Sequence, residues 1–353
     1  MTKYQLLLTT LLLFCIMGAR AQERCIVVEK GNAESLLRAI EEANRTNADT
    51  AAPRLFVLIP DGTYHLGTHC LTTITGHNVA LVGQSMDRTV IVNEPPIEEE
   101  SINKTATMLN RGRNTYVQDL TLQNALDYYR TEGAGRAVVW QDKGNRAIFK
   151  RVRMLSYQDT YYSHSEQCQH YFEECDIHGT VDFICGAGDI YFNRCDIVTE
   201  KRDLKGLYRN VIVAARTSET KWGYVFDHCT IYSDMSPFHL ARGWHTTPRC
   251  AWLYTRIEQP DLLLPERFDP LGMRTVDSEF YEYHSTDLKG NLISPASNIV
   301  TYELNEQRRS VETIMTDKQA KRYTLKNVFP DWRPEKTVND LQKEIERLKR
   351  RYL

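Results

Sequence analysis

A short pattern of apolar and polar positions recurs along the middle of the chain. In each copy the second, fifth and seventh positions are mostly apolar, and the positions between them are mostly polar. Successive copies begin 32, 23, 20 and 34 residues apart. Units of this length, with insertions confined to loops, are typical of a solenoid whose stacked coils bury one another's apolar face. The copies are YVQDLTL at Tyr116–Leu122, IFKRVRM at Ile148–Met154, YFEECDI at Tyr171–Ile177, YFNRCDI at Tyr191–Ile197 and VFDHCTI at Val225–Ile231.

The residue types in these copies favour strands over helices. β-branched and aromatic side chains are frequent, and the unequal spacing argues against short helical repeats. We therefore predict an all-β fold, a right-handed parallel β-helix, in which equivalent residues of successive coils stack inside the solenoid. The expected internal rows are Phe149, Phe172, Phe192 and Phe226, and Val152, Cys175, Cys195 and Cys229.

Two segments outside the repeats have helical spacing. Asn32 to Asn47 carries Leu36, Leu37, Ile40 and Ala43 on one face, and is predicted to be a short helix that caps the first coil. Pro334 to Leu353 carries Val338, Leu341, Ile345 and Leu348 among lysines and arginines. We expect a charged amphipathic helix packed on the solenoid, with a partner-binding role as the alternative. The predicted organisation is a leader at 1–21, the solenoid at 22–335 and the terminal helix at 336–353.

The first residues have the features of a secretory signal peptide. Lys3 precedes an almost entirely apolar run from Leu6 to Gly18, and small residues at Ala19 and Ala21 precede Gln22. The run is too short for a membrane span, and no later segment is long enough. The sequence therefore predicts a secreted protein, and leaves extracellular and periplasmic locations open.

Charge and cysteine content narrow the class of protein further. Loss of Lys3 and Arg20 changes the formal net charge from −2 to −4, which does not suggest a nucleic-acid partner. An acidic polymer would need a local basic groove.

An even number of cysteines in an exported protein allows disulfides. Three of them occupy the inward row, where we expect packed thiols. A Cys25–Cys70 bond, or one between Cys168 and another loop cysteine, stays open, and the absence of a CxxC pair gives a zinc site little support.

Two aspartates have the same offset from the repeat. Asp159 lies seven residues after Val152, and Asp182 lies seven residues after Cys175. Parallel strands are about 4.8 Å apart, so the two carboxyl groups should be neighbours, and one of them should retain its proton more easily. The alternative is that each aspartate only bonds the backbone of a turn.

Several motifs around these aspartates resemble those of one enzyme family. GTVDFICG resembles the GxVDFIFG signature of the pectin methylesterases, YQDTYY resembles their QDTLY, and LARGW at Leu240–Trp244 resembles their LGRPW. PDGTYHL stands where that family has GxYxE, and RAVVW at Arg136–Trp140 where it has QAVAL. All five occur in the family's order, and the resemblance covers roughly residues 33 to 335.

The resemblance implies hydrolysis of galacturonate methyl esters in pectin, that is, in homogalacturonan. Asp182 would be the nucleophile and Asp159 the general acid and then base. Arg242 would keep Asp182 ionised, and Gln158 would donate to the oxyanion. Trp244, Arg136 and Phe183 would contact the substrate. Because this mechanism uses only carboxylates, an arginine and an amide, we expect neither a cofactor nor a metal. A capped solenoid needs no partner to cover its ends, so we expect a monomer. The charge does not predict a nucleic-acid partner, and the hydropathy does not predict a membrane span.

Departures from the family motifs keep other interpretations open. Arg136 replaces the glutamine of QAVAL, Leu66 the glutamate of GxYxE, and Ala241 and Gly243 the glycine and proline of LGRPW. Arg136 either takes over the oxyanion role, binds a substrate carboxylate or is an ordinary solvated arginine.

Two other functions are weighed against the esterase. One is a pectic depolymerase, of the polygalacturonase or pectate lyase type, and the other is a non-catalytic carbohydrate-binding solenoid. An inverting glycosidase needs carboxyl groups about 6.5–9.5 Å apart, wider than adjacent coils provide. A lyase needs a cluster of acidic calcium ligands, which the surroundings of the two aspartates lack.

Overall fold

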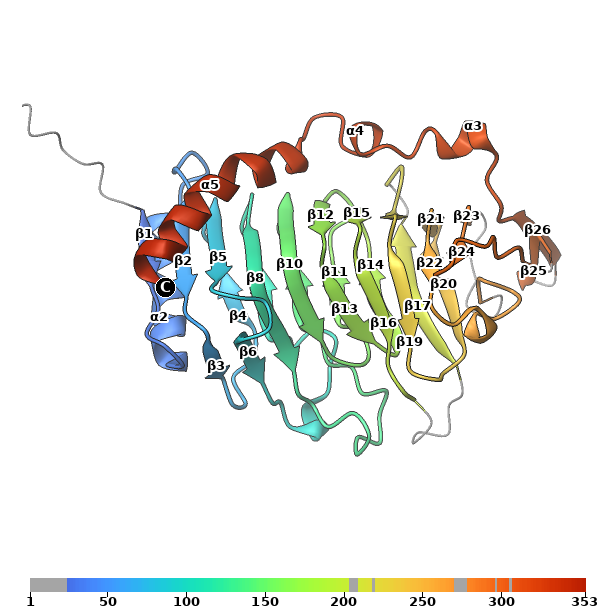
Figure 1. Cartoon of the computed structure of the whole chain (residues 1–353). Helices are drawn as coiled ribbons and strands as arrows, with labels where there is room; N and C mark the ends of the chain where they lie inside the picture. Colours follow the sequence, from blue (N-terminus) through green and yellow to red (C-terminus); the bar gives the residue numbers. More distant parts are fainter. Residues whose placement is uncertain (1–23, 203–208, 218–219, 270–277, 296, 305–306) are drawn as a thin grey trace, which may run out of the picture.

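The computed structural model describes residues 24–202, 209–217, 220–269, 278–295, 297–304 and 307–353. The predicted leader at 1–21 lies outside these residues. Within them, parallel strands curl into two long sheets that form the sides of a solenoid, as Figure 1 shows. The predicted all-β parallel β-helix is confirmed.

The larger sheet, sheet A, contains 17 strands in the described part of the chain. They are β1 Cys25–Val27, β2 Leu55–Ile59, β3 Gly62–His65, β5 Val79–Gly83, β6 Thr89–Asn93, β8 Tyr116–Asn124, β10 Ala147–Leu155, β12 Gln169–Glu173, β13 Asp176–Gly179, β15 Asp189–Asn193, β16 Asp196–Thr199, β18 Tyr224–Asp227, β19 Thr230–Ser233, β21 Arg249–Leu253, β22 Arg256–Ile257, β23 Glu279–Tyr283 and β24 Thr286–Asp287.

The second sheet, sheet B, carries the candidate site. Its strands lie in the order β20-β17-β14-β11-β9-β7-β4. They are β4 Thr72–Ile74, β7 Met108–Asn110, β9 Trp140–Asp142, β11 Tyr161–Ser163, β14 Val181–Gly186, β17 Asn210–Thr217 and β20 Phe238–Thr246.

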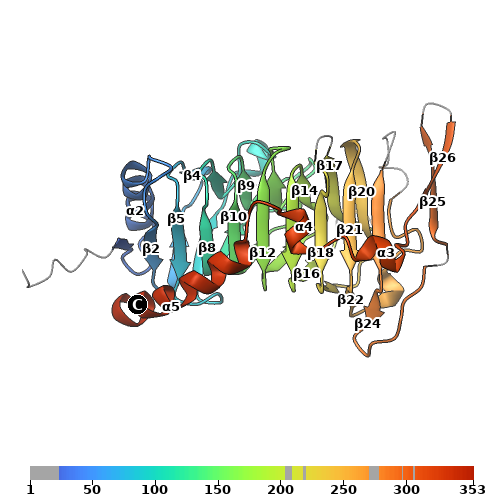
Figure 2. The same cartoon turned by 90° about the horizontal axis from the view of Figure 1, so that it is seen from above.

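The remaining elements lie at the ends and along one side of the solenoid. An antiparallel hairpin extends from its C-terminal end (Figure 2). These elements are β25 Ile299–Leu304, β26 Gln307–Glu312, α2 Ala33–Thr46, α3 Asp317–Ala320, α4 Leu325–Val328, α5 Pro334–Tyr352, and the short 3₁₀ helices η1 Ile97–Glu99 and η3 Pro260–Leu262.

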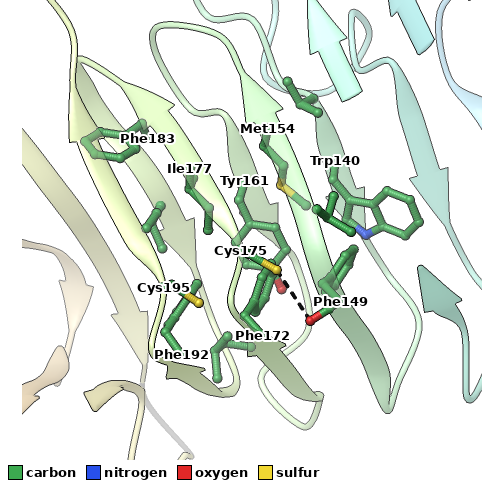
Figure 3. Close-up of a cluster of buried hydrophobic side chains, with 14 of the residues drawn as sticks. Trp140, Phe149, Met154, Tyr161, Phe172, Cys175, Ile177, Phe183, Phe192 and Cys195 are labelled. Carbon is green, nitrogen blue, oxygen red and sulfur yellow. Dashed lines mark hydrogen bonds between the residues drawn. The ribbon is translucent and has the colours of Figure 1, made fainter. Parts of the chain in front are cut away.

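The predicted internal rows are present. Phe149, Phe172, Phe192 and Phe226 pair in register along sheet A. Their ring centroids are 4.3, 4.6 and 4.4 Å apart, and Trp252 continues the stack at 3.8 Å. The cysteines of the second row are buried beside them (Figure 3). Aromatic stacking therefore holds successive coils in one register.

A left-handed residue occurs at the fourth position of each copy. A regular strand alternates its side chains, so the second and fifth positions could not both face inward. A residue with positive φ shifts this alternation, so the fifth and seventh positions join the second inside. Such a conformation costs about 1–2 kcal/mol in a non-glycine residue, and the packing of the rows must offset that cost. These residues are Asp119, Arg151, Glu174, Arg194 and His228, with φ of 55, 48, 52, 52 and 54°.

Both predicted terminal helices are present. The Asn32 side chain caps α2 by accepting from the backbone N–H of Ser35 at 3.0 Å, and the helix ends at Asn47. Leu36 and Ile40 are buried from this helix against the first coil. The helix therefore covers the open apolar end of the solenoid.

The C-terminal strap, defined as residues 313–353, runs back along sheet A from its last coil toward its first (Figures 1 and 2). It covers the first-position side chains of the copies, which face away from the solenoid interior. Phe329 and Ile345 of the strap are fully buried in one cluster with Tyr116, Tyr171 and Val225. The sequence predicted the packed terminal helix, but not that the strap would cover the outward row of so many coils.

The described cysteines are reduced. Cys175, Cys195 and Cys229 are buried thiols, as predicted. No disulfide joins the eight cysteines at 25–250 that the structure describes, so the Cys25–Cys70 alternative is not realised there. No helix among the described residues has the length and apolarity of a membrane span.

A charged histidine lies on the outer face of sheet A. The two ring nitrogens of His178 lie 2.9 Å from Asp176 Oδ1 and 2.6 Å from Glu200 Oε1. Burial lowers the pKa of His178, but the hydrogen bonds and charges of these carboxylates outweigh it and raise the pKa to about 9. The imidazolium therefore ties β13 to the residue that follows β16.

We predict that this ion pair makes stability depend on pH. Because the pKa of His178 is raised from 6.5 to about 9, its contribution is fully present below about pH 6.5 and is lost as the pH rises through about 9. The free energy of unfolding in urea should therefore differ most between wild type and His178→Gln near pH 6, and least near pH 10. His65→Gln, an exposed histidine on β3, controls for loss of a surface imidazole. A difference that grows between pH 6 and pH 10 would contradict the assignment.

Candidate active site

Most of the predicted site residues come together in one pocket on the outer face of sheet B. The pocket has a volume of about 200 Å³. Its acidic, basic and amide groups come from the loop between β8 and β9, from the turn before β11, from β14 and from β20. The lining residues are Ile102, Arg136, Gln158, Asp159, Asp182, Cys185, Ala214, Arg242 and Trp244.

Asp182 is held by a bidentate arginine. Arg242 Nε donates to Asp182 Oδ1 at 2.7 Å, and Arg242 Nη2 donates to the other carboxylate oxygen. The pairing is possible because β14, β17 and β20 are consecutive parallel strands. The two hydrogen bonds of the guanidinium fix the orientation of the Asp182 carboxylate.

Asp159 is in the opposite electrostatic state. It is 4% exposed, and the structure gives it one side-chain contact with another described residue, the Cys185 thiol at 3.9 Å. Burial, and secondly the charge of Asp182, raise the pKa of Asp159 well above its usual value, against the opposing charges of Arg136 and Arg242. The pocket therefore pairs a buried carboxyl group whose pKa is raised with a carboxylate that is held by a guanidinium.

Both aspartates have left-handed backbone, with φ of 61° at Asp159 and 53° at Asp182. Such values are uncommon outside glycine, and they interrupt the inward-outward alternation of the strand that follows. The two carboxyl groups consequently leave the coil on the outer face. Neither makes the side-chain bonds to turn amides that the alternative interpretation required, among the described residues.

Gln158 and Arg136 lie on adjacent coils and form a parallel bridge. The Gln158 amide makes no hydrogen bond to another described residue, so it can donate to a bound molecule. Arg136 is anchored by Glu100, whose Oε1 accepts from Nη2 at 2.7 Å and whose Oε2 accepts from Nε at 3.2 Å and from the backbone N–H at 2.7 Å. Arg136 is therefore held by an ion pair, with its side chain 41% exposed.

Glu100 is a site residue that the sequence did not reveal. It belongs to no recognisable motif and lies 36 residues before its partner. Hydrogen bonds from Arg136 lower the pKa of Glu100, so the pair is an ionised one. The contact between Glu100 and Arg136 is evident only in the folded structure.

The pocket has an aromatic side. Trp244 lies half-buried, and its ring centroid is 6.1 Å from that of Tyr162. The guanidinium of Arg216 lies 5.6 Å from the Trp244 ring centroid. An aromatic surface of this kind suits the apolar face of a sugar ring.

The prediction that Phe183 contacts the substrate is wrong. Its ring has no exposed surface and packs in the interior cluster labelled in Figure 3, so it cannot contact a substrate. Neighbouring residues of a strand point to opposite faces, and Asp182 faces outward. The strand pairing of β14 then shifts between Val181 and Ile184, which brings Cys185 to the pocket. Alternation alone could have excluded Phe183, whereas the shift was not readable from the sequence.

A row of basic residues follows the pocket along sheet B. Arg111, Lys143 and His164 each come directly after strands whose last residues, Asn110, Asp142 and Ser163, are in register. Ser163 pairs with Gly186 of β14, which pairs with Ala215 of β17, so Arg216 continues this row. Arg216 Nη2 donates to the backbone oxygen of His164 at 3.0 Å. Partial burial and the charges of Lys143, Arg216 and Arg111 lower the pKa of His164. This basic row suits a polymer that carries negative charge.

The arrangement can perform acyl chemistry. An ionised carboxylate fixed by arginine can attack a carbonyl carbon, a neighbouring protonated carboxyl can protonate the leaving group, and an amide can stabilise the oxyanion. No group of three or more metal-ligating side chains was found among the residues that the structure describes.

Comparison with known families supports this description. The model of the pectinesterase family matches residues 25–329. Among curated proteins, a probable pectinesterase/pectinesterase inhibitor from Arabidopsis thaliana is 27% identical over 246 residues, which are 67% of this chain and 44% of the relative. Pectinesterase 2 from Citrus sinensis is 27% identical over 241 residues, 65% of this chain and 44% of the relative. The chain thus spans less than half the length of these relatives.

Solved structures agree on the fold. Pectin methylesterase PemA from Erwinia chrysanthemi superposes with a TM-score of 0.64 at 24% identity, over 84% of this chain and 93% of that one. The pectin methylesterase from Aspergillus niger gives a TM-score of 0.62 at 20% identity, over 90% and 98%. At these identities the likeness shows a shared β-helix.

We predict that the pKa of Asp159 depends on its neighbour. In Asp182→Asn the adjacent negative charge is gone and Arg242 is left uncompensated, so the pKa of Asp159 should fall toward its usual value. Titration of ¹³C-labelled aspartate carboxyls by NMR measures this pKa. Asp234→Asn, an exposed loop residue, should leave it where it is in the wild type. An unchanged or higher pKa in Asp182→Asn would show that the two carboxyls do not interact.

Proposed function

Because the chain belongs to the pectinesterase family, we propose that it hydrolyses the methyl esters of galacturonate residues in pectin, releasing methanol and leaving free carboxylates. The observation that carries this proposal is the pair of unlike carboxyl groups, Asp182 held by Arg242 beside a buried Asp159 of raised pKa. An ester needs a nucleophile and a proton donor for the alkoxide, and the pair supplies both.

In the first half of the proposed reaction, an Asp182 oxygen attacks the ester carbonyl carbon. Negative charge develops on the carbonyl oxygen, to which the Gln158 amide donates a hydrogen bond. When the carbon–oxygen bond to the methoxy group breaks, Asp159 gives its proton to that oxygen and methanol leaves. The galacturonate acyl group is then joined to Asp182 as an anhydride.

In the second half, the ionised Asp159 takes a proton from water, and the resulting hydroxide attacks the acyl carbon. The bond to Asp182 breaks, and its carboxylate returns to Arg242. Asp159 is again protonated, so the site returns to its starting state. The net change consumes one water for each methyl ester and leaves one new galacturonate carboxyl group, which ionises in solution.

Substrate recognition is assigned to the groups around this pair. Trp244 offers an aromatic surface for one sugar ring, and the basic row of Arg111, Lys143 and Arg216 offers positive charge to an acidic polymer. One solved neighbour is described as a pectin methylesterase in complex with a hexasaccharide. The features of Lys3 to Gln22 support a secreted, soluble enzyme that meets its polymer outside the cytoplasm.

The alternative functions fit the site less well. A depolymerase acts on the glycosidic bond and needs either widely separated carboxyls or calcium, whereas here the two carboxyls line one pocket of about 200 Å³. A purely binding solenoid has no use for a buried protonated carboxyl beside an ionised one. The esterase uses Asp159, Asp182 and Arg242 of the pocket in the reaction.

The first test is methanol release from methylated polygalacturonate, measured together with polymer length. The wild type should release methanol without shortening the chain, and Asp182→Asn should lose nearly all turnover because an amide is a poor nucleophile. Asp234→Asn is the control, and circular dichroism checks the fold of each variant. Activity should survive exhaustive chelation. Wild-type methanol release by a folded Asp182→Asn protein would end the assignment, and shortening of the polymer would indicate a depolymerase.

A second prediction concerns Arg136, which stands where the family has glutamine. If its guanidinium stabilises the oxyanion, Arg136→Ala should lower kcat on the order of 10²-fold, and Arg136→Gln should recover part of this loss. If it instead binds a substrate carboxylate, Arg136→Ala should chiefly raise KM on sparsely methylated pectin. Full activity of the alanine variant on both highly and sparsely methylated pectin would remove Arg136 from the mechanism.

A further inference from the structure

A second pocket lies on the other side of the turn that carries Gln158 and Asp159. We call it the tyrosine pocket, after Tyr128, Tyr129 and Tyr157 in its wall. Its volume is about 450 Å³, against about 200 Å³ for the catalytic pocket, and is within the range of about 300–1,000 Å³ common for small-molecule sites. Nothing in the proposed esterase mechanism uses it.

The two pockets are neighbours along the chain. Tyr157 lines the tyrosine pocket, and the next residue, Gln158, lines the catalytic pocket. The loop between β8 and β9 likewise contributes Asp127 to Tyr129 to one pocket and Arg136 to the other. The two pockets are therefore separated by one turn and one loop, to which both are attached.

The three tyrosines form an aromatic platform, in which Tyr128 is 1% exposed and is the buried layer, and Tyr129 and Tyr157 are half-buried and accessible. The rings of Tyr128 and Tyr157 stack with centroids 4.7 Å apart and planes 8° from parallel. Tyr129 meets both edge-on, at 5.3 and 5.4 Å. The Tyr129 hydroxyl donates to the backbone oxygen of Lys201 at 2.7 Å, and the Tyr128 hydroxyl accepts from Arg202 Nε at 3.2 Å.

The loop between β8 and β9 packs closely on this platform at Gly135. Gly135 has φ of 77°, and a Cβ atom there would lie 2.5 Å from the Tyr128 ring. Only glycine allows the loop to close over the tyrosines in this way. The platform is therefore formed before any ligand arrives, which lowers the entropy cost of binding.

The charge of the tyrosine pocket is opposite to that of the catalytic pocket. Glu94, Asp127 and Glu200 line it, and its one lining cation, His178, is already paired with Glu200 and with Asp176. Galacturonate carboxylates would be repelled from the tyrosine pocket, whereas Arg136 and Arg242 attract them to the catalytic pocket. A ligand of the tyrosine pocket must be neutral or positively charged.

The geometry of the tyrosine rings distinguishes a neutral ligand from a positively charged one. A cage for an organic cation needs aromatic faces turned toward a common space. Here the faces of Tyr128 and Tyr157 are turned toward each other. A bare metal ion is also disfavoured, because no group of three ligating side chains was found among the described residues. An aromatic platform with hydrogen-bond acceptors on its rim suits a neutral ring with hydroxyl groups.

The rim has polar side chains to meet such hydroxyls. Glu94 is exposed, Gln123 is half-buried, and neither side chain is hydrogen-bonded to another described residue. A carboxylate accepts from hydroxyl groups, and an amide both donates and accepts. These groups can replace the water that a sugar loses on binding.

We propose that the tyrosine pocket binds a neutral sugar unit carried as a branch on the same pectic chain that the catalytic pocket demethylates. The branch assignment rests on the proposed function, but the chemistry of the pocket does not. The adjacent pockets then read two features of one substrate, an esterified acidic backbone and a neutral side group. The enzyme would favour branched over linear pectin.

The binding test uses Asp182→Asn, so that no ester is turned over. Neutral galactose and arabinose tetrasaccharides, trigalacturonate and spermidine are titrated separately and followed by NMR. We expect saturable binding of at least one neutral tetrasaccharide that weakens about tenfold, or by about 1.4 kcal/mol, when Tyr129→Ala is added, because an aromatic contact with the sugar is lost. Glu94→Gln, at an exposed position, gives a second variant that removes no packing. Binding only of trigalacturonate or spermidine, or neutral binding insensitive to both changes, would overturn the assignment.

The kinetic test separates a branch from an independent glycan. The ratio of kcat/KM on branched pectin to that on linear methylated polygalacturonate should fall in Tyr129→Ala and in Glu94→Gln. Tyr254→Ala, a 42% exposed tyrosine outside both pockets, should keep the wild-type ratio. An unchanged ratio alongside neutral-sugar binding would overturn the branch and point to a separate glycan.

The two proposals can fail independently. Methanol release without neutral-sugar binding would leave the esterase standing and remove the tyrosine pocket from its specificity. Neutral-sugar binding by a wild-type protein that releases no methanol would support the pocket and overturn the esterase.

Discussion

Backbone pairing between successive coils is the constraint on which the rest of the structure depends. Parallel strands in register place equivalent residues of adjacent coils about 4.8 Å apart, whatever the length of the loop between them. Phe149, Phe172 and Phe192 reinforce that register from inside by stacking. Asp159 and Asp182 share one offset from the repeat, so the same pairing brings their carboxyl groups into one pocket. The chemistry of the site is thus set by the packing of the solenoid.

The parts of the fold that follow from this periodicity were predictable from the sequence. The inward rows, the two terminal helices and the pairing of Asp159 with Asp182 all repeat a local signal. The strap over sheet A was predictable only in part, because an amphipathic helix shows that one face is buried and not what covers it. Glu100 was not predictable, since a single acidic residue in a loop carries no pattern. Phe183 was wrongly assigned to substrate binding because every residue of the family motif was assumed to face the site. In the structure Asp182 faces outward, and Phe183 faces the interior.

The catalytic pocket and the tyrosine pocket, on the two sides of the turn at Tyr157 and Gln158, differ in charge. The catalytic pocket contains Arg136 and Arg242 and is followed by the basic row, which suits an acidic backbone. On the other side of Tyr157 the carboxylates outnumber the one histidine. Coulomb forces act over about 10 Å at moderate salt, so these opposite fields operate on one bound polymer at once. A chain that presents acid groups to one side and neutral groups to the other satisfies both.

The ion pair of Arg136 with Glu100 also explains how an arginine can stand where related enzymes have a neutral amide. An isolated guanidinium beside Asp159 would favour its ionised form, and so would oppose the retention of the proton that the proposed leaving group needs. Glu100 supplies the compensating charge, and among the surrounding groups it acts on the pKa of Asp159 in the direction opposite to Arg136. Two of the guanidinium nitrogens are committed to Glu100, and the pair as a whole is neutral. The remaining N–H groups can still donate to an oxyanion. The raised pKa of Asp159 comes first from burial and then from Asp182, and Glu100 offsets part of the opposing effect of Arg136. The substitution is therefore compatible with the proposed acid role of Asp159, and the ion pair reduces its electrostatic effect.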